Sequence, residues 1–183
     1  MPKAVKASKN SVRFILALDP SGSFNEGKGT TGYCIFDTMT HMFLACGSIY
    51  AKDFNNMEEY WDRVLTLIDA KWHYLKRDMV VVCEDYLLYA TKLQDQINSR
   101  METPKLIGCI QHFCYKNNIP YRMQTASEVK KRWANHILAH KGYIKIINAR
   151  GQLKPTSGDC TTYSHHSLDA IRHAIHYATF KNK

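Results

Sequence analysis

Three acidic residues stand where the chain leaves segments with strand-like or helical patterns. Asp19 ends the apolar run in FILALDPSG, Glu84 follows the run MVVVC, and Asp169 lies in SHHSLDAIRHA, which has helical spacing. Two strand ends and one helix face can converge at one edge of a sheet. Clustered carboxylates repel one another unless cations lie between them. The pattern therefore predicts a divalent-metal site suited to cutting phosphodiesters, in which metal ions stabilise the attacking and leaving oxygens.

Each acid taken alone has a simpler explanation. Asp19 can open a turn, Glu84 can mark a strand leaving the core, and Asp169 can face solvent. The combination is the stronger argument, because Mg²⁺ prefers oxygen ligands and usually takes a few carboxylates together with water and substrate phosphate. A structural cluster without metal would leave its like charges uncompensated.

The terminal helix is expected to carry its acid to the strand ends. His166, Asp169 and His173 are three or four residues apart and share an arc beside the apolar stripe of this helix. Small side chains at Ala170 and Ala174 would let the helix lie close to the sheet. The apolar stripe comprises Leu168, Ile171, Ile175 and Ala178.

The elements that position these residues indicate a mixed α/β sheet covered by helices. Turns separate the first three strands, which predicts an antiparallel meander, and the later strands alternate with helices. The expected strands are 12–18, 30–37, 42–50, 79–83 and 119–124. The expected helices are 55–75, 99–117, 127–140 and 164–180, with a loop between 142 and 163.

Length and charge set the broad class. A chain of 183 residues predicts a single domain over 1–183, with a flexible basic arm at 1–11. Lys and Arg number 25 against 16 Asp and Glu, so the formal net charge is +9 although three acids are assigned to one pocket. This balance favours a polyanion partner, because Lys and Arg release counterions from phosphates. A soluble basic protein without such a partner fits the charge equally well.

Cysteine usage and hydropathy bear on the compartment. The six cysteines are scattered and form no C-x-x-C pair, which favours a reducing, cytoplasmic location. The apolar run FILAL after the basic start is too short for a signal peptide. No segment approaches the roughly 18 apolar residues that a membrane span needs, so no membrane association is expected.

An ordered set of motifs resembles a known family. D-P-S-G is followed by T-T-G-Y, then by an apolar strand ending in Glu84, by T-A-S-E-V-K-K at 125–131, and by D-A-I-R-H-A-I on the last helix. This order resembles the RuvC-type Holliday junction resolvases of the RNase H-like superfamily, over nearly the whole chain. The divergent loops suggest a phage or viral member. The resemblance implies an RNase H-like mixed β-sheet, an antiparallel meander of three strands plus parallel strands, flanked by helices.

The resemblance also implies a catalytic site. Asp19, Glu84 and Asp169 would be catalytic metal ligands, and His166, in the place of the family's fourth site residue, would be a fourth such ligand, with His165 as a competing candidate. Two Mg²⁺ ions about 4 Å apart would support hydrolysis without a covalent intermediate. Mn²⁺ is expected to substitute, because imidazole is a softer ligand than carboxylate.

Substrate and assembly are implied in the same way. The family resolves four-way DNA by symmetric paired nicks that leave ligatable 5′-phosphates, which implies a two-fold symmetric homodimer. The helix around 101–113 is the expected interface, although its apolar stripe equally fits ordinary core.

Candidate DNA contacts lie on three segments. Lys130 matches a basic residue of the family's segment, and Lys131 and Arg132 stand beside it, although a solvated helix face explains these two as well. Tyr89 is a candidate wedge near the junction centre. Lys28 lies in the loop SFNEGKG, which separates D-P-S-G from T-T-G-Y and departs from the family's compact spacing.

Other functions fit parts of the pattern. The same acids would serve another RNase H-like nuclease acting on flaps, branched DNA or RNA–DNA hybrids, and the fold would serve a junction-binding protein without catalysis. D-P-S-G with the later T-G is also similar to the phosphate hairpin of actin-like ATPases, but those need two such domains, so no nucleotide cofactor is expected. A zinc finger at His136 and His140 lacks paired cysteines.

Overall fold

The computed structural model describes residues 12–25, 27–87, 101–147, 153–160 and 163–180. The predicted basic arm at 1–11 and the candidate wedge Tyr89 lie outside the described residues. The strands of the main sheet are β1 (Phe14–Asp19), β2 (Thr30–Asp37), β3 (Met42–Tyr50), β4 (Met79–Asp85) and β5 (Tyr121–Thr125). The helices are the short η1 (Ala51–Asp53), α1 (Met57–Tyr74), α3 (Glu102–Lys116), α4 (Ala126–Arg132), α5 (Asn135–His140) and α6 (His165–Phe180).

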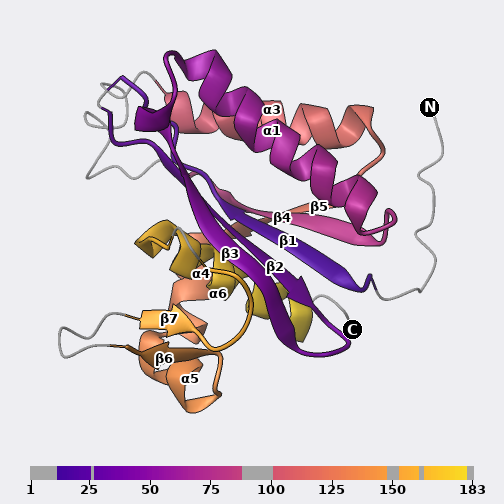
Figure 1. Ribbon diagram of the computed structural model, residues 1–183, viewed down its shortest axis with the longest axis vertical. Helices are drawn as coiled ribbons and strands as arrows, with labels where there is room; N and C mark the ends of the chain where they lie inside the picture. Colours follow the sequence, from indigo (N-terminus) through magenta and orange to yellow (C-terminus); the bar gives the residue numbers. More distant parts are fainter. Residues whose placement is uncertain (1–11, 26, 88–100, 148–152, 161–162, 181–183) are drawn as a thin grey trace.

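The sheet combines an antiparallel half with a parallel half. Its strand order is β3-β2-β1-β4-β5, in which β2 pairs antiparallel with β1 and β3. Strand β4 lies parallel to both β1 and β5. Helices α1 and α3 cover one face and α4 and α6 the other (Figure 1). The mixed sheet flanked by helices that the sequence predicts is confirmed.

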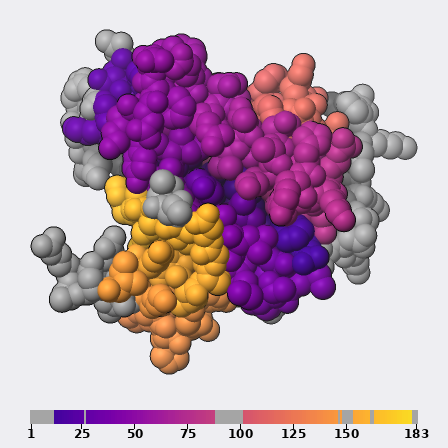
Figure 2. All heavy atoms as spheres, viewed as in Figure 1, coloured from indigo at the N-terminus to yellow at the C-terminus, as the bar shows by residue number. Residues whose placement is uncertain are grey.

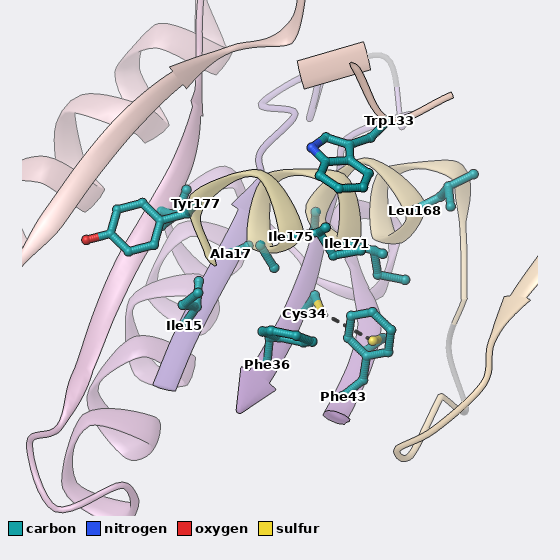
Figure 3. Packing of buried hydrophobic residues seen from close by; sticks show 14 of the residues in the cluster. Ile15, Ala17, Cys34, Phe36, Phe43, Trp133, Leu168, Ile171, Ile175 and Tyr177 are labelled. Carbon is teal, nitrogen blue, oxygen red and sulfur yellow. Dashed lines mark hydrogen bonds between the residues drawn. The ribbon is translucent and has the colours of Figure 1, made fainter. Parts of the chain in front are cut away.

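Apolar residues on successive positions of the strands fill two separate cores. In β1, Ile15 and Ala17 face the core under α6, whereas Leu16 and Leu18 face the core under α1 and α3. A strand covered on both faces needs apolar residues at every position, which explains the unbroken apolar runs of β1 and β4. Figure 3 shows α6 directing Ile171 and Ile175 toward the strands. In Figure 2 the orange and yellow C-terminal segments lie below the purple residues of α1.

The start of α6 lies directly on the sheet. Ala170 and Ala174 are fully buried, in agreement with the close approach expected from their size. A reciprocal cap begins the helix, with Ser164 and Ser167 exchanging side-chain and backbone hydrogen bonds. The Ser167 hydroxyl also donates to the Gly47 carbonyl of β3 at 2.7 Å, so the helix start is fastened to the sheet.

Two expectations differ from the structure. The helix predicted over 127–140 is interrupted between α4 and α5, where the backbone of Trp133 and Ala134 is not helical. The Trp133 side chain is buried against α6, and the backbone carbonyl of Trp133 accepts a hydrogen bond from Arg172 Nε at 3.0 Å. Tertiary packing therefore overrides the local helical pattern.

The segment predicted as a loop over 142–163 contains a two-stranded antiparallel sheet. Its strands are β6 (Ile144–Ile146) and β7 (Leu153–Pro155). Beyond it, the backbone of Asp159 pairs with the edge strand β3, donating to Leu44 at 3.1 Å and accepting from Cys46 at 2.8 Å. Such pairing covers part of a sheet edge that would otherwise be exposed. Among the described helices, none has both the length and the apolar composition to cross a membrane.

Gly32 tests the contact between β2 and α6. A Cβ atom at this position would overlap the backbone of His166 and Ser167. We expect Gly32→Ala to lower the free energy of unfolding by about 1–3 kcal/mol, because α6 must move to make room. Gly108→Ala, where a Cβ meets no atom within 4 Å, is the control and should be neutral or stabilising by about 0.5–1 kcal/mol in a helix. Thermal unfolding of both variants measures the difference, and equal melting temperatures would contradict the close approach.

Candidate metal centre at the end of the sheet

Three carboxylates from two strands and one helix meet at one end of the sheet. Strands β1 and β4 run parallel, and Leu18 of β1 is paired with Cys83 of β4. Asp19 and Glu84 are the next residues on these two strands, so they lie side by side. Ala17 and Val82, two residues before these acids, face α6. Because side chains alternate along a strand, the two acids point to the same face, on which α6 carries Asp169. One ligand oxygen of each of the three lies within 4.8 Å of the others.

The cluster is electrostatically strained. Asp19 and Asp169 are buried, with 5% and 7% exposure, and Glu84 is partly exposed. Burial raises the pKa of Asp19, and repulsion from Glu84 and Asp169 adds to the increase, against the hydrogen bond from His166. A cation placed among these oxygens would relieve the repulsion.

The two adjacent histidines of α6 differ in placement. His166 Nδ1 lies 2.7 Å from Asp19 Oδ2, so this side chain borders the acidic cluster. His165 is exposed, and its ring stacks on that of His166 with centroids 4.1 Å apart. The oxygens that converge belong to the three carboxylates, and His166 reaches them through Asp19.

Two cationic side chains contact Asp169. Lys130 Nζ lies 2.9 Å from Asp169 Oδ2, and Arg172, one turn further along α6, pairs with Asp169 Oδ1. Burial opposes the charge of Lys130, but the hydrogen bond and attraction of Asp169 raise its pKa above the ordinary value. Of the other proposed DNA contacts, Lys131 and Lys28 are exposed, and the exposed Arg132 stacks over the Phe180 ring at 4.7 Å.

The structure adds contacts that the sequence did not predict. His173, fully buried on α6, lies 2.9 Å from Glu84 Oε2 through Nε2 and 2.9 Å from Gln124 Oε1 through Nδ1. The only indication in the sequence that His173 belongs near the site was its spacing of four residues from Asp169, which placed both on the same arc of the helix. Nothing in the local pattern indicated Gln124, whose partner His173 is 49 residues away, or the contacts of Arg172 with Trp133 and Asn135. The pairing of Arg172 with Asp169 spans only three residues, a spacing at which side chains on one helix can meet.

The loop after Asp19 is anchored to α3. Glu102, the buried first residue of α3, accepts the backbone N–H of Phe24 at 2.7 Å and also the side-chain amide of Asn25. The Gly22 N–H donates to Thr103 Oγ1 at 2.9 Å. These contacts hold the chain that leaves the acidic cluster, and no local sequence pattern indicated them.

The donor set fits a hard divalent cation. Among the described residues, Asp19 Oδ1 and Glu84 Oε1 accept no hydrogen bond, whereas the second oxygen of each contacts a histidine. Asp19 and Glu84 therefore each retain an oxygen for a cation, whereas both oxygens of Asp169 are paired with Lys130 and Arg172. Three carboxylate oxygens in close proximity suit Mg²⁺ or Mn²⁺.

A five-stranded mixed sheet with a terminal helix packed across it defines an RNase H-like α/β fold. Among solved structures, this fold matches T. thermophilus RuvC in complex with Holliday junction substrate, with a TM-score of 0.64 over 92% of this chain and 94% of that chain. The two sequences are 14% identical. The chain thus has a RuvC-like fold, in agreement with the resemblance found in the sequence.

The sequence comparisons give no further assignment. No protein-family model matches this sequence, and no curated protein matches it significantly. The similarity is therefore carried by the three-dimensional arrangement.

Asp19 should control the pH dependence of stability in the absence of metal. The pKa of Asp19 in the folded protein lies above the ordinary value of 3.8. The contribution of Asp19 to folding stability is therefore fully present below pH 3.8 and is lost as pH rises through the raised pKa. We expect Asp19→Asn in EDTA to be more stable than wild type at pH 7, with a difference that shrinks toward pH about 4. Mn²⁺ should stabilise only the wild type. Melting temperatures over this range measure both effects.

Asp37→Asn provides a control of opposite sign. Burial opposes ionisation of Asp37, but hydrogen bonds from Arg13 and from the backbone of Met39 and Thr40 hold its pKa below the ordinary value. This variant should be less stable than wild type at pH 7, and the deficit should diminish as pH falls through the lowered pKa. A destabilised Asp19→Asn at pH 7 would show that the acidic cluster is not under strain.

Proposed function

We propose that this protein is a metal-dependent endonuclease that resolves Holliday junctions by symmetric paired nicks. The observation that carries the proposal is the convergence of Asp19, Glu84 and Asp169 within 4.8 Å at the end of a RuvC-like sheet. The basic charge of +9 supports a nucleic acid as the substrate. The neighbouring RuvC structure, which contains a Holliday junction substrate, favours branched DNA over other nucleic acids.

The residues proposed to hold metal are the three acids with His166 beside them. Two Mg²⁺ ions, or Mn²⁺ in their place, would activate water and stabilise the leaving oxygen of the scissile phosphodiester. Asp19 and Glu84 each offer the oxygen that contacts no histidine, and Asp169 offers oxygens now paired with Lys130 and Arg172. His166, whose Nδ1 lies 2.7 Å from Asp19 Oδ2, is proposed as the fourth ligand, and its contact with Asp19 at the edge of the cluster supports this.

The DNA is proposed to approach along α4 toward the acidic cluster. Lys130 already lies at hydrogen-bond distance from Asp169, so it is placed to contact a phosphate that reaches the cluster. Lys131 and Arg132 extend this basic surface along the same helix. Lys28 is proposed as a further contact to the DNA, and Tyr89, which lies outside the described residues, is proposed as a wedge near the junction centre.

A homodimer would present two such sites to the two strands to be cut. The proposed interface is an apolar groove of about 730 Å³ between α1 and α3, which includes Trp61, Leu65, Cys109 and Phe113. A two-fold axis beside this groove would join identical surfaces. Sedimentation at micromolar concentration should give the mass of two chains, and a single-chain mass would exclude this assembly under those conditions.

Cleavage of a four-way junction tests the proposal directly. With Mg²⁺ or Mn²⁺ the wild type should nick opposing strands, and a chelator should abolish the reaction. Asp19→Asn should lower the rate by more than about 100-fold, because even partners of metal ligands account for about 10–100-fold. The variant should still bind the junction, since one repulsive carboxylate has been removed. Flap, RNA–DNA hybrid and plain duplex are the controls, and equal or faster cutting of these would argue for another nuclease activity.

Lys130→Ala tests the path of the DNA. We expect weaker binding to junctions of any sequence and a salt dependence reduced by about one unit in the slope of log K against log salt, as for loss of one phosphate contact. Lys71→Ala is the matched control, because α1 covers the opposite face of the sheet. Fluorescence anisotropy at several salt concentrations gives the slopes. If both variants keep the wild-type slope, Lys130 does not contact phosphate.

A further inference from the structure

His173 is a buried polar residue with both ring nitrogens engaged. Its side chain has no exposed surface. Nε2 lies 2.9 Å from Glu84 Oε2 and Nδ1 lies 2.9 Å from Gln124 Oε1. Burying a polar ring is costly unless it is hydrogen-bonded, so these two contacts fix the ring in one orientation.

The two partners of His173 come from neighbouring strands. Glu84 of β4 and Gln124 of β5 are directly paired in the parallel register. A ring that descends from α6 onto this pair reaches both side chains. His173 lies one turn after Asp169, so one helix carries an acid of the cluster and the group that contacts a second acid.

The direction of the hydrogen bond to Glu84 follows from its chemistry. An ionised carboxylate only accepts, so His173 Nε2 carries a proton and donates it to Glu84. Gln124 is 5% exposed, and when Oε1 faces the ring its buried Nε2 atom has no hydrogen-bond partner within the described parts of the chain. Turning the amide by 180° pairs Nε2 with His173 Nδ1 and assigns the ring proton to Nε2. Either orientation leaves His173 as the donor to Glu84.

We propose that His173, held in place by Gln124, is a positioning residue that fixes the Glu84 carboxylate for binding a divalent cation. The hydrogen bond holds Oε2, so the carboxylate cannot rotate freely and Oε1 remains for the cation. This inference rests on the proposed metal site. Hydrogen-bonded partners of ligating groups commonly account for about 10–100-fold in metal affinity.

His176 offers a matched control on the same helix. It is 1% exposed, and its Nε2 lies 3.3 Å from Glu128 Oε1 of α4. The residue thus shares with His173 its helix, its burial and a glutamate partner. Its partner does not belong to the acidic cluster. Replacing His176 removes a buried imidazole without touching Glu84.

The test is Mn²⁺ binding by the full-length, metal-free protein, measured by calorimetry without DNA. We expect His173→Leu to weaken Mn²⁺ binding by about 10–100-fold. His173→Gln, whose amide can still donate near the Nε2 position, should recover most of the affinity. His176→Leu should bind Mn²⁺ within about twofold of wild type. Thermal unfolding in EDTA shows whether each variant is folded.

Cleavage adds a second measurement that a general loss of structure would not reproduce. His173→Leu should need a higher Mg²⁺ concentration for half-maximal cutting, while its rate at saturating Mg²⁺ should recover much of the wild-type value. Wild-type Mn²⁺ affinity in a folded His173→Leu overturns the proposal. Equal losses in His173→Leu and His176→Leu also overturn it, because they would indicate a purely structural role.

Two further outcomes are separable. If His173→Leu does not fold, Gln124→Leu frees the ring and should lower Mn²⁺ affinity in the same direction, by less; unchanged affinity then overturns the proposal. A wild-type protein that binds Mn²⁺ but cuts no branched DNA refutes the proposed nuclease function and leaves the positioning role supported by the binding data. A wild-type protein that binds no Mn²⁺ overturns both.

Discussion

Repulsion among three carboxylates is the constraint on which the rest of the structure depends. Asp19 and Glu84 come together because β1 and β4 are parallel neighbours that end at the same edge. Asp169 joins them because α6 lies directly on the sheet, at a distance that is possible because Gly32 has no Cβ atom. The hydrophobic cores on both faces of the sheet hold this arrangement, because burying their apolar residues stabilises the fold by more than the repulsion destabilises it. Burial of the two cores therefore offsets the destabilisation that the acidic cluster causes when it holds no cation.

Each acid has basic neighbours, and most of these are on one helix. His166 contacts Asp19, His173 contacts Glu84, and Arg172 contacts Asp169, all from α6. Each of these groups lies three or four residues from Asp169, which places it near the side of the helix that faces the strand ends. The position of α6 thus sets how far Asp169 lies from the other two acids, and it also sets where most of the basic groups contact them. A shift of the helix along the sheet would change every contact in the site together.

Local patterns in the sequence were sufficient for the five strands of the main sheet, for most helices and for the convergence of the three acids, but not for β6 and β7. Strand runs such as MVVVC and the arc around Asp169 depend on near neighbours, which the sequence displays. The break at Trp133 was not predictable, because it depends on packing against α6 and on Arg172, which lies 39 residues away. The anchoring of the loop after Asp19 by Glu102 spans 78 residues at Phe24. The contacts of His173 likewise join three elements that only the folded chain brings together.

The two cations on Asp169 differ in how readily they can give way to a metal ion. The Arg172 side chain is 13% exposed and also donates to the Trp133 carbonyl and the Asn135 side chain, so it is held on three sides. The Lys130 side chain is 47% exposed and has a long flexible stem. A cation entering the cluster would compete with Lys130 for Asp169 Oδ2 far more easily than with Arg172. Displacement of Lys130 would free its charge beside the cluster, where a phosphate is proposed to bind, so metal entry and phosphate contact would favour each other.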